Sequence, residues 1–193
     1  FNNYPPQFES SLVPAGYQGY RWATQICPFW NTYLLSSLVR FSKEIEESRV
    51  PLALKRAHSY RIDMSSSQDS ENLFSGDYNW RSFMLESYAQ AHDAKFVVIT
   101  DISEFYRRLY HHRIENSLEQ IINGETPDNI IKILNVFSRG SSYGIPIGGP
   151  AARILSEVVI NQIDVLLVSK RIKACRFADD FHIFTDSEED SYR

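Results

Sequence analysis

The chain lacks several features that would place it in common classes of protein. Only two of its 193 residues are cysteine, Cys27 and Cys175, and they are too far apart to suggest a disulfide framework or a zinc site. No apolar run is long enough to span a membrane, and no signal-peptide pattern opens the chain. We therefore expect two reduced, structural cysteines in a cytoplasmic protein that has no membrane partner.

An excess of positive charge is also missing. The chain has 20 Lys and Arg residues against 24 Asp and Glu residues, a formal net charge of -4, whereas nucleic-acid-binding domains are commonly basic. The basic residues are clustered, however, and a local cluster can bind phosphate groups in an acidic protein. The two clusters comprise Arg40, Lys43, Arg49, Lys55, Arg56 and Arg61, and then Arg107, Arg108 and Arg113.

Two adjacent acids in the sequence RFADDFHIF are the most informative residues. Asp179 and Asp180 lie between two short segments with the composition of strands, so we expect them at a tight turn. Neighbouring carboxylates repel each other unless a cation neutralises them, and Mg²⁺ prefers carboxylate oxygens. The alternative is an ordinary hairpin turn, because Asp is a common turn residue.

A third acid has a similar setting. Asp101 ends the apolar run of residues 95–100, which is typical of a buried strand, and acids at strand ends often carry the chemistry of α/β folds. An N-cap is the alternative for Asp101. Downstream, the sequence GIPIGGP predicts a loop, and residues 151–168 have helical spacing. Glycines before a helix allow a nucleotide or a template strand to approach the backbone.

The order of these segments resembles motifs A, B and C of the reverse transcriptase palm. The resemblance covers residues 95–185, about half of the chain. Asp101 matches the metal ligand of motif A, and Tyr106 matches the aromatic gate under the sugar. GIPIGGP matches motif B. FADD matches the YADD-type motif C, with Phe177 in place of Tyr.

The resemblance extends upstream and contains one departure. LKRAHSYRID resembles the fingers segment that grips the incoming triphosphate, with Lys55 and Arg61 at the two basic positions; a solvated basic face is the alternative. Many reverse transcriptases have Gln where this chain has Ile147. Ile147 and the GPAAR continuation are more similar to the bacterial abortive-infection and defence-associated enzymes. Gln at this position helps to place the template or the nucleotide.

The resemblance implies nucleotidyl transfer with two metal ions. It makes Asp101, Asp179 and Asp180 the catalytic residues and metal ligands, with the carbonyl of Ile102 as a further ligand. Mg²⁺ is the expected cofactor and Mn²⁺ an alternative. The expected partners are an RNA template, a DNA primer or product, and a deoxynucleoside triphosphate, together with a second copy of the chain or an accessory defence protein. The implied nucleotide-binding residues are Lys55, Arg61, Tyr106, Ile147 and Gly148.

Three functions are open at this point. The first is an RNA-directed DNA polymerase of bacterial anti-phage defence, in which the Tyr106 ring would exclude the ribose 2′ hydroxyl and so select deoxynucleotides. The second is a DNA polymerase of the same fold that works without a template or is primed on protein. The third is a non-catalytic nucleic-acid-binding module, and the three intact carboxylates argue against it.

The implied fold is α+β, with right-hand polymerase fingers and palm and an antiparallel palm sheet flanked by helices. Residues 1–94 would form the fingers and an N-terminal helical region, and residues 95–113 the palm with motif A. Residues 114–142 would form a helical insertion, and residues 143–193 the palm with motifs B and C. The thumb is absent from this chain, so we expect part of a longer protein that does not extend a primer alone.

Apolar spacing predicts the remaining elements. Adjacent residues on a helix point in different directions, so His111 and His112 are expected to be structural rather than a joint metal site. Residues 52–62 are expected to form a hairpin and residues 65–72 a polar loop. Helices are predicted over residues 29–49, 76–92, 103–110, 113–122, 127–137 and 151–168.

Overall fold

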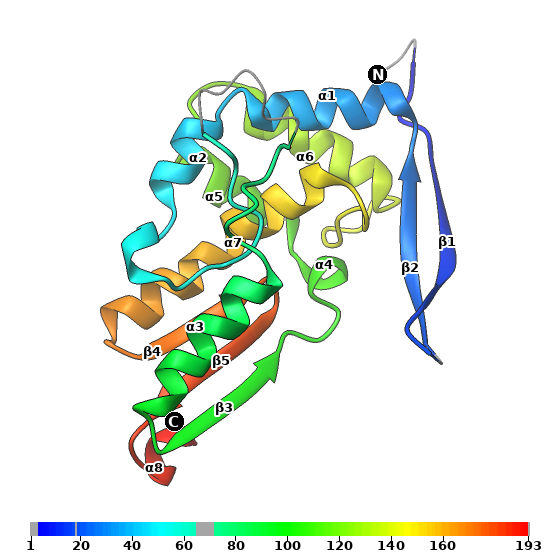
Figure 1. The fold of residues 1–193 in the computed structure, drawn as a ribbon. Coiled ribbons are helices and arrows are strands. Elements are labelled where there is room, and N and C mark those ends of the chain that lie inside the picture. The colour runs from blue at the N-terminus through cyan, green and yellow to red at the C-terminus, as the bar shows by residue number, and fades with distance from the viewer. Residues whose placement is uncertain (1–3, 18, 65–71, 193) are drawn as a thin grey trace. The chain divides into compact units, whose positions relative to one another are not determined.

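The computed structural model describes residues 4–17, 19–64 and 72–192 (Figure 1). It confirms the α+β prediction, because antiparallel strands are combined with helices. The chain forms two compact units. Unit 1 contains the residues up to Phe41 and Glu104–Val159, and unit 2 contains Ser42–Ser103 and the residues from Ile160 onward. Apart from its last residue, the polar loop expected at 65–72 lies outside the described residues.

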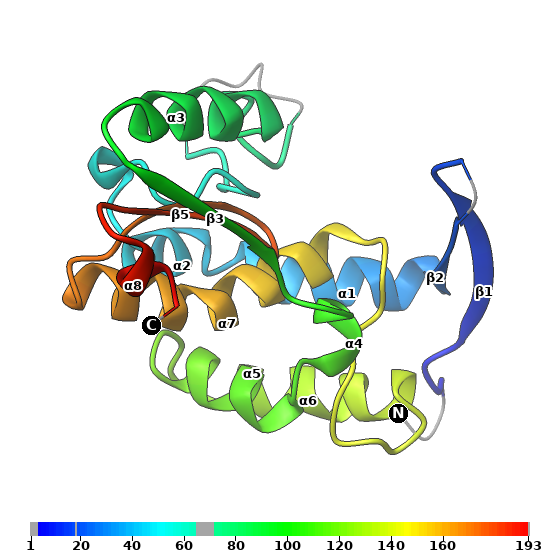
Figure 2. The same ribbon diagram turned by 90° about the horizontal axis from the view of Figure 1, so that it is seen from below.

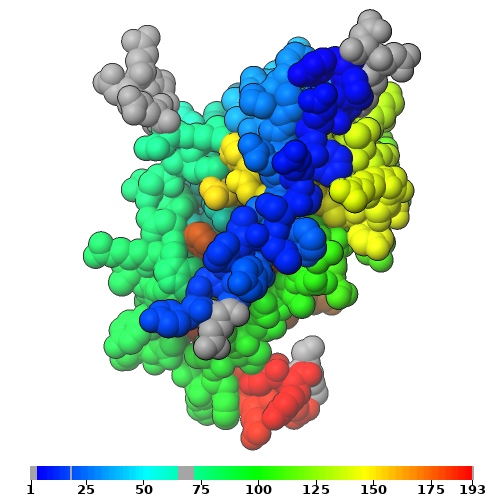
Figure 3. Space-filling model, turned by 90° about the vertical axis from the view of Figure 1, so that its right-hand side faces the viewer, coloured from blue at the N-terminus to red at the C-terminus, as the bar shows by residue number. Residues whose placement is uncertain are grey.

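Unit 1 begins with a hairpin that was not predicted. Strand β1 (Phe8–Ala15) pairs antiparallel with β2 (Gly19–Ile26), from Phe8 opposite Ile26 to Ala15 opposite Gly19. Both strands are largely exposed, and Figure 3 shows them as a strip of dark blue surface. A Cβ atom at Gly19 would lie 2.8 Å from the carbonyl oxygen of Ala15, so the tight turn requires glycine there. Pro14 inside β1 weakens the strand pattern of the sequence.

The core of unit 1 is helical. It contains α1 (Pro28–Val39), α4 (Phe105–Arg108), α5 (His111–Glu119), α6 (Thr126–Phe137) and the first half of α7 (Pro150–Ser169). Helices α5 and α6 lie side by side (Figure 2). Their apolar faces have the predicted spacing of three and four residues. Fully buried side chains of this core include Leu34, Leu38, Ile114, Leu118, Ile130, Ile133 and Leu134.

Unit 2 is built on a three-stranded antiparallel sheet. Its strands are β3 (Phe96–Asp101), β5 (Asp180–Thr185) and β4 (Lys173–Phe177), in that order across the sheet. Helix α3 (Trp80–His92) covers one face, and α8 (Glu188–Ser191) contacts β3 and β5 (Figure 2). The elements α2 (Ser42–Ser48) and η1 (Leu52–Leu54) precede α3. The core under α3 contains Phe83, Cys175 and Phe184.

Several predicted elements differ from the structure. Residues 96–101 form the strand β3, but this strand lies at the edge of the sheet and its side chains are largely exposed rather than buried. The helix expected over 29–49 is split into α1 and α2, where the Phe41 N–H donates to Leu38 in a tighter turn. Helix α3 begins at Trp80 rather than at residue 76, because Asn79 and Ser82 form a capping box. The hairpin expected over 52–62 is instead η1 followed by a segment that bridges β4 in parallel.

The two cysteines are free thiols in different surroundings. Burial raises the pKa of the Cys175 thiol to about 12, so it is neutral inside the core of unit 2. A hydrogen bond with the Tyr4 hydroxyl lowers the pKa of Cys27, which lies closer to the surface. Within the described part of the chain, no helix combines the length and the apolar character needed to cross a membrane.

Candidate active site

The pairing of β3 with β5 brings two of the predicted acids together. Asp101 is the last residue of β3 and lies directly opposite Asp180, the first residue of β5. The N–H of Ile102 donates to the carbonyl oxygen of Asp179 at 3.2 Å, which extends the pairing by one step. Directly opposed residues in an antiparallel pair project from the same face of the sheet. All four residues therefore lie at one end of the sheet, within unit 2.

The turn that carries the two adjacent acids has an unusual backbone. Ala178 has a φ of +52°, a left-handed conformation that is uncommon for a residue other than glycine. Before it, the Phe177 ring packs against the rings of Tyr60 and Trp80, with centroids 5.8 and 5.5 Å away. This packing accounts for an aromatic residue at the first position of FADD.

The acids of this sheet end are accessible to solvent. Asp101 is exposed, and Asp179 and Asp180 are half-buried. Three carboxylates and a nearby backbone carbonyl are the hard oxygen donors that Mg²⁺ and Mn²⁺ prefer, so the donor set fits a divalent cation. Burial lowers the pKa of the neighbouring His182 ring, and the charge of Asp180 acts in the opposite direction.

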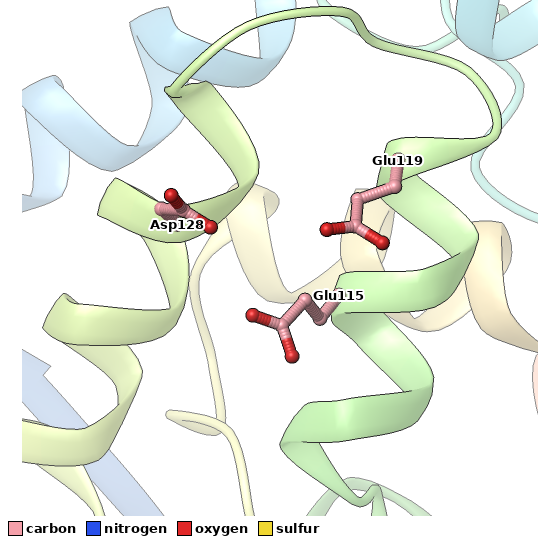
Figure 4. Close-up of side chains that lie close together, drawn as sticks. All are labelled: Glu115, Glu119 and Asp128. Carbon is pink, nitrogen blue, oxygen red and sulfur yellow. The ribbon is translucent and has the colours of Figure 1, made fainter.

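The donor atoms of Asp101, Asp179 and Asp180 do not all lie within 4.8 Å of one another, whereas those of a different acidic cluster do. Among the described residues, Glu115, Glu119 and Asp128 are the one group of potential ligands whose donor atoms all lie within 4.8 Å of one another (Figure 4). They project from α5 and α6, and Glu119 and Asp128 are exposed. Asp128 lies in the first turn of α6, where the helix dipole favours an acid. A helix-terminal role explains Asp128 without a metal, and the sequence analysis did not single out these residues.

The two predicted triphosphate ligands have different surroundings in unit 2. The side chain of Lys55 is 66% exposed and forms an ion pair with Glu86 at 3.4 Å. Arg61 is buried, and it donates to a Glu46 carboxylate oxygen at 3.0 Å and to the Val50 carbonyl at 2.7 Å. Arg61 is therefore already bound to a carboxylate inside the protein, one that it shares with Arg49, and its position in the sequence did not indicate this.

The other predicted nucleotide-binding residues belong to unit 1. The carbonyl of Tyr106 accepts a hydrogen bond from the Ile145 N–H at 3.0 Å, which ties α4 to the glycine-rich loop. In the same loop, the Ile147 carbonyl accepts a hydrogen bond from the Thr24 N–H of β2 at 2.9 Å. Gly148 is exposed and has a φ of +123°, which only glycine adopts readily.

Ile147 also lines a cavity of about 470 Å³ within unit 1. The hairpin, α4 and the chain that follows α6 contribute to its wall. Arg107 lies over the Trp22 ring and Arg139 over the Phe8 ring, each with the guanidinium carbon 5.8 Å from the ring centre. Arg107 also forms an ion pair with Glu104 at 3.3 Å. The lining combines two guanidinium groups with aromatic rings, and none of the described residues in it is acidic. Such a combination suits an unpaired nucleotide.

The two adjacent histidines, His111 and His112, have different surroundings. His111 is buried, and its ring nitrogens contact the Asn135 side-chain oxygen and the Gly144 carbonyl oxygen, both at 2.8 Å. The ring of His112 is exposed and lies 3.6 Å from a carboxylate oxygen of Glu115. The structural role predicted for His111 is confirmed, because it anchors the start of α5 to the glycine-rich loop.

A known protein family matches most of the chain. Residues 41–193 match the family described as Reverse transcriptase (RNA-dependent DNA polymerase). The match covers the β3–β5 sheet end and the segment that contains Lys55 and Arg61, and it begins after the β1–β2 hairpin. No curated protein matches the chain.

Lys55 and Arg61 are expected to differ in their contribution to stability. We predict that Arg61→Ala lowers the free energy of unfolding by roughly 3 kcal/mol, because it removes one partner of a buried ion pair. Lys55→Ala should change it by less than about 1 kcal/mol, because the Lys55–Glu86 pair is exposed on the lysine side. Urea unfolding of both variants measures the difference, and equal losses would contradict the structural role of Arg61.

Proposed function

We propose, because the chain belongs to the reverse transcriptase family, that it adds deoxynucleotides to a 3′ hydroxyl and that Asp101, Asp179 and Asp180 hold the metal ions for this reaction. One observation supports the assignment of these residues above the others: Asp101 lies opposite Asp180 in the β3–β5 register. Like charges directly opposed across two strands are unfavourable, so a chain shaped by stability alone would avoid this pair.

Nucleotidyl transfer requires an activated 3′ oxygen and stabilisation of the charge on the transferring phosphoryl group. Two divalent cations about 4 Å apart supply both effects when they are bound. In our proposal the three carboxylates hold and orient these cations, and the Ile102 carbonyl adds an oxygen ligand. These residues therefore contribute by positioning the cations and by their negative charge, because phosphoryl transfer depends mainly on the positions of the reacting groups and on electrostatic stabilisation.

We assign the binding of the triphosphate to two basic residues that precede α3 in the chain, Lys55 and Arg61. Lys55 is the simpler ligand, because its amine is exposed and acts as a point charge for phosphate oxygens. Arg61 can contribute only if a phosphate displaces the Glu46 carboxylate, to which its guanidinium is bound. We also propose that the segment containing Lys55 and Arg61 belongs to the polymerase fingers and that the β3–β5–β4 sheet belongs to the palm.

We assign the binding of the sugar, the base and the template strand to Tyr106, Ile147 and Gly148. An aromatic ring five residues after the first metal ligand favours deoxynucleotides, because a ribose 2′ hydroxyl would clash with it. The exposed, left-handed Gly148 offers a backbone that a nucleotide can approach closely. The paired Arg and aromatic side chains beside Ile147 support contact with an unpaired strand.

Ile147 also favours a specific subtype and a second candidate function. Where many reverse transcriptases have Gln, this chain has an aliphatic side chain without hydrogen-bonding groups. We therefore place the protein with the bacterial defence-associated enzymes and keep synthesis without a template, or from a protein primer, as the second candidate. Primer extension with and without an RNA template distinguishes the two.

Asp179→Asn in the full-length protein tests the metal assignment. We predict that it reduces primer extension by at least about a hundredfold, because it removes a charged metal ligand, while the melting temperature stays close to that of the wild type. Asp186→Asn is the matched control, since Asp186 is an exposed acid just after β5, and it should retain full activity. Equal activity of wild type and Asp179→Asn would refute the assignment.

Tyr106→Ala tests the selection of the sugar. We predict that this variant incorporates ribonucleotides at least about tenfold better than the wild type, since a single steric contact is typically worth one to two powers of ten in specificity. Tyr106→Phe keeps the ring and should exclude ribonucleotides as the wild type does. The ratio of kcat/KM values for the two sugars is the measurement. An unchanged ratio in Tyr106→Ala would show that another residue forms the gate.

A further inference from the structure

A buried ion pair lies directly beside the turn that carries the proposed metal ligands. Arg176 in β4 and Asp164 in α7 are both within unit 2 and are only 1% and 4% exposed. The Arg176 Nε atom donates to Asp164 Oδ1 at 3.0 Å, and Nη2 donates to Oδ2 at 2.6 Å. This two-point contact fixes the plane of the guanidinium group and directs its remaining nitrogen, Nη1, toward the turn.

Hydrogen bonds hold both backbone polar groups of one residue in the turn, Ala178. Arg176 Nη1 donates to the Ala178 carbonyl oxygen at 2.9 Å, and the Ala178 N–H donates to the Ser59 hydroxyl oxygen at 2.9 Å. Arg176 Nη1 also lies 3.3 Å from the same hydroxyl oxygen of Ser59. Ala178, the residue with the left-handed φ, is therefore bound through its N–H and its carbonyl, immediately before Asp179.

Ser59 is itself fixed against β4. The N–H of Arg176 donates to the Arg56 carbonyl at 2.7 Å, and the His58 N–H donates to the Arg176 carbonyl at 2.9 Å. These bonds form a parallel bridge between Ala57 and Arg176. Ser59 is fully buried, and its carbonyl accepts a hydrogen bond from Arg49 Nη2 at 2.9 Å. The hydroxyl of Ser59 is thus a rigid support for the turn.

We infer that Ser59, Arg176 and Asp164 are positioning residues that hold the Ala178 backbone in its left-handed conformation and thereby orient Asp179 and Asp180 for metal binding. The inference rests on the proposed function, because it assumes that these two acids are the metal ligands. A left-handed alanine is costly and persists only when its surroundings fix it. Without these bonds the turn would relax toward more common backbone angles, and the two carboxylates would move with it.

A role in packing alone makes a different prediction. Replacing a buried ion pair or a buried hydroxyl affects stability, but it has no reason to change the affinity for a divalent cation. Residues that orient metal ligands typically alter that affinity by about 10- to 100-fold when they are mutated. Metal affinity in the absence of substrate therefore separates the two roles, independently of catalytic activity.

The experiment compares five variants of the full-length protein, one of which is Asp179→Asn, which removes a proposed metal ligand. Ser59→Ala removes the support for the Ala178 N–H, and Ser59→Thr keeps a hydroxyl. Arg176→Lys removes the two-point contact with Asp164. Ser156→Ala is the matched control, because Ser156 is equally buried and donates to the Arg153 carbonyl within its own helix. Mn²⁺ binding is measured by electron paramagnetic resonance without nucleotide, and amide exchange is measured at Ala178.

We expect Ser59→Ala and Arg176→Lys to weaken Mn²⁺ binding about 10- to 100-fold, and Ser59→Ala to accelerate exchange of the Ala178 amide. Ser59→Thr should recover most of the affinity, and Ser156→Ala should match the wild type. Should Arg176→Lys fail to fold, the serine series alone decides the matter. Mn²⁺ affinity that is lost in Asp179→Asn but unchanged in both Ser59→Ala and Arg176→Lys would overturn the inference while leaving the proposed function intact. Mn²⁺ binding that is insensitive to Asp179→Asn would refute the proposed function, and the inference with it.

Discussion

Backbone pairing between β3 and β5 is the constraint on which the candidate site depends. It brings Asp101 to Asp180 across two strands from distant parts of the chain, and it fixes which side chains share a face. A shift of one residue in this register would turn Asp101 to the opposite face. Burial of Phe181 and Phe184 fixes the place of β5, but the side chains of the edge strand β3 are largely exposed, so the register of β3 depends mainly on its backbone hydrogen bonds to β5.

The sheet end combines features that oppose stability with features that restore it. Opposed acids and a left-handed alanine both disfavour folding. Around them, the Phe177 ring is packed between aromatic residues, and Arg176 is bound to Asp164 inside the protein. The acids are exposed or half-buried, whereas Ala178 and the Arg176–Asp164 pair are buried, which is the arrangement expected of a binding site supported by a rigid scaffold.

The sequence was sufficient to predict that Asp101, Asp179 and Asp180 lie at strand ends, but not which residues support them. Asp101 and the FADD turn follow from strand-like runs that end in carboxylates, a local pattern. The burial of Arg61 against Glu46, and the contact of Ser59 with Ala178, depend on the packing of segments that are distant in the chain. Local propensity carries no information about such contacts. The β1–β2 hairpin could have been found, because the glycines around its turn separate two strand-like runs.

The most direct measurement of the central claim is the position of bound Mn²⁺ in crystals of the full-length protein with a deoxynucleoside triphosphate. We predict two anomalous peaks about 4 Å apart, coordinated by Asp101 and Asp179 and adjoining Asp180. Peaks that occur only at Glu115, Glu119 and Asp128, or no peak at the β3–β5 sheet end, would contradict the account.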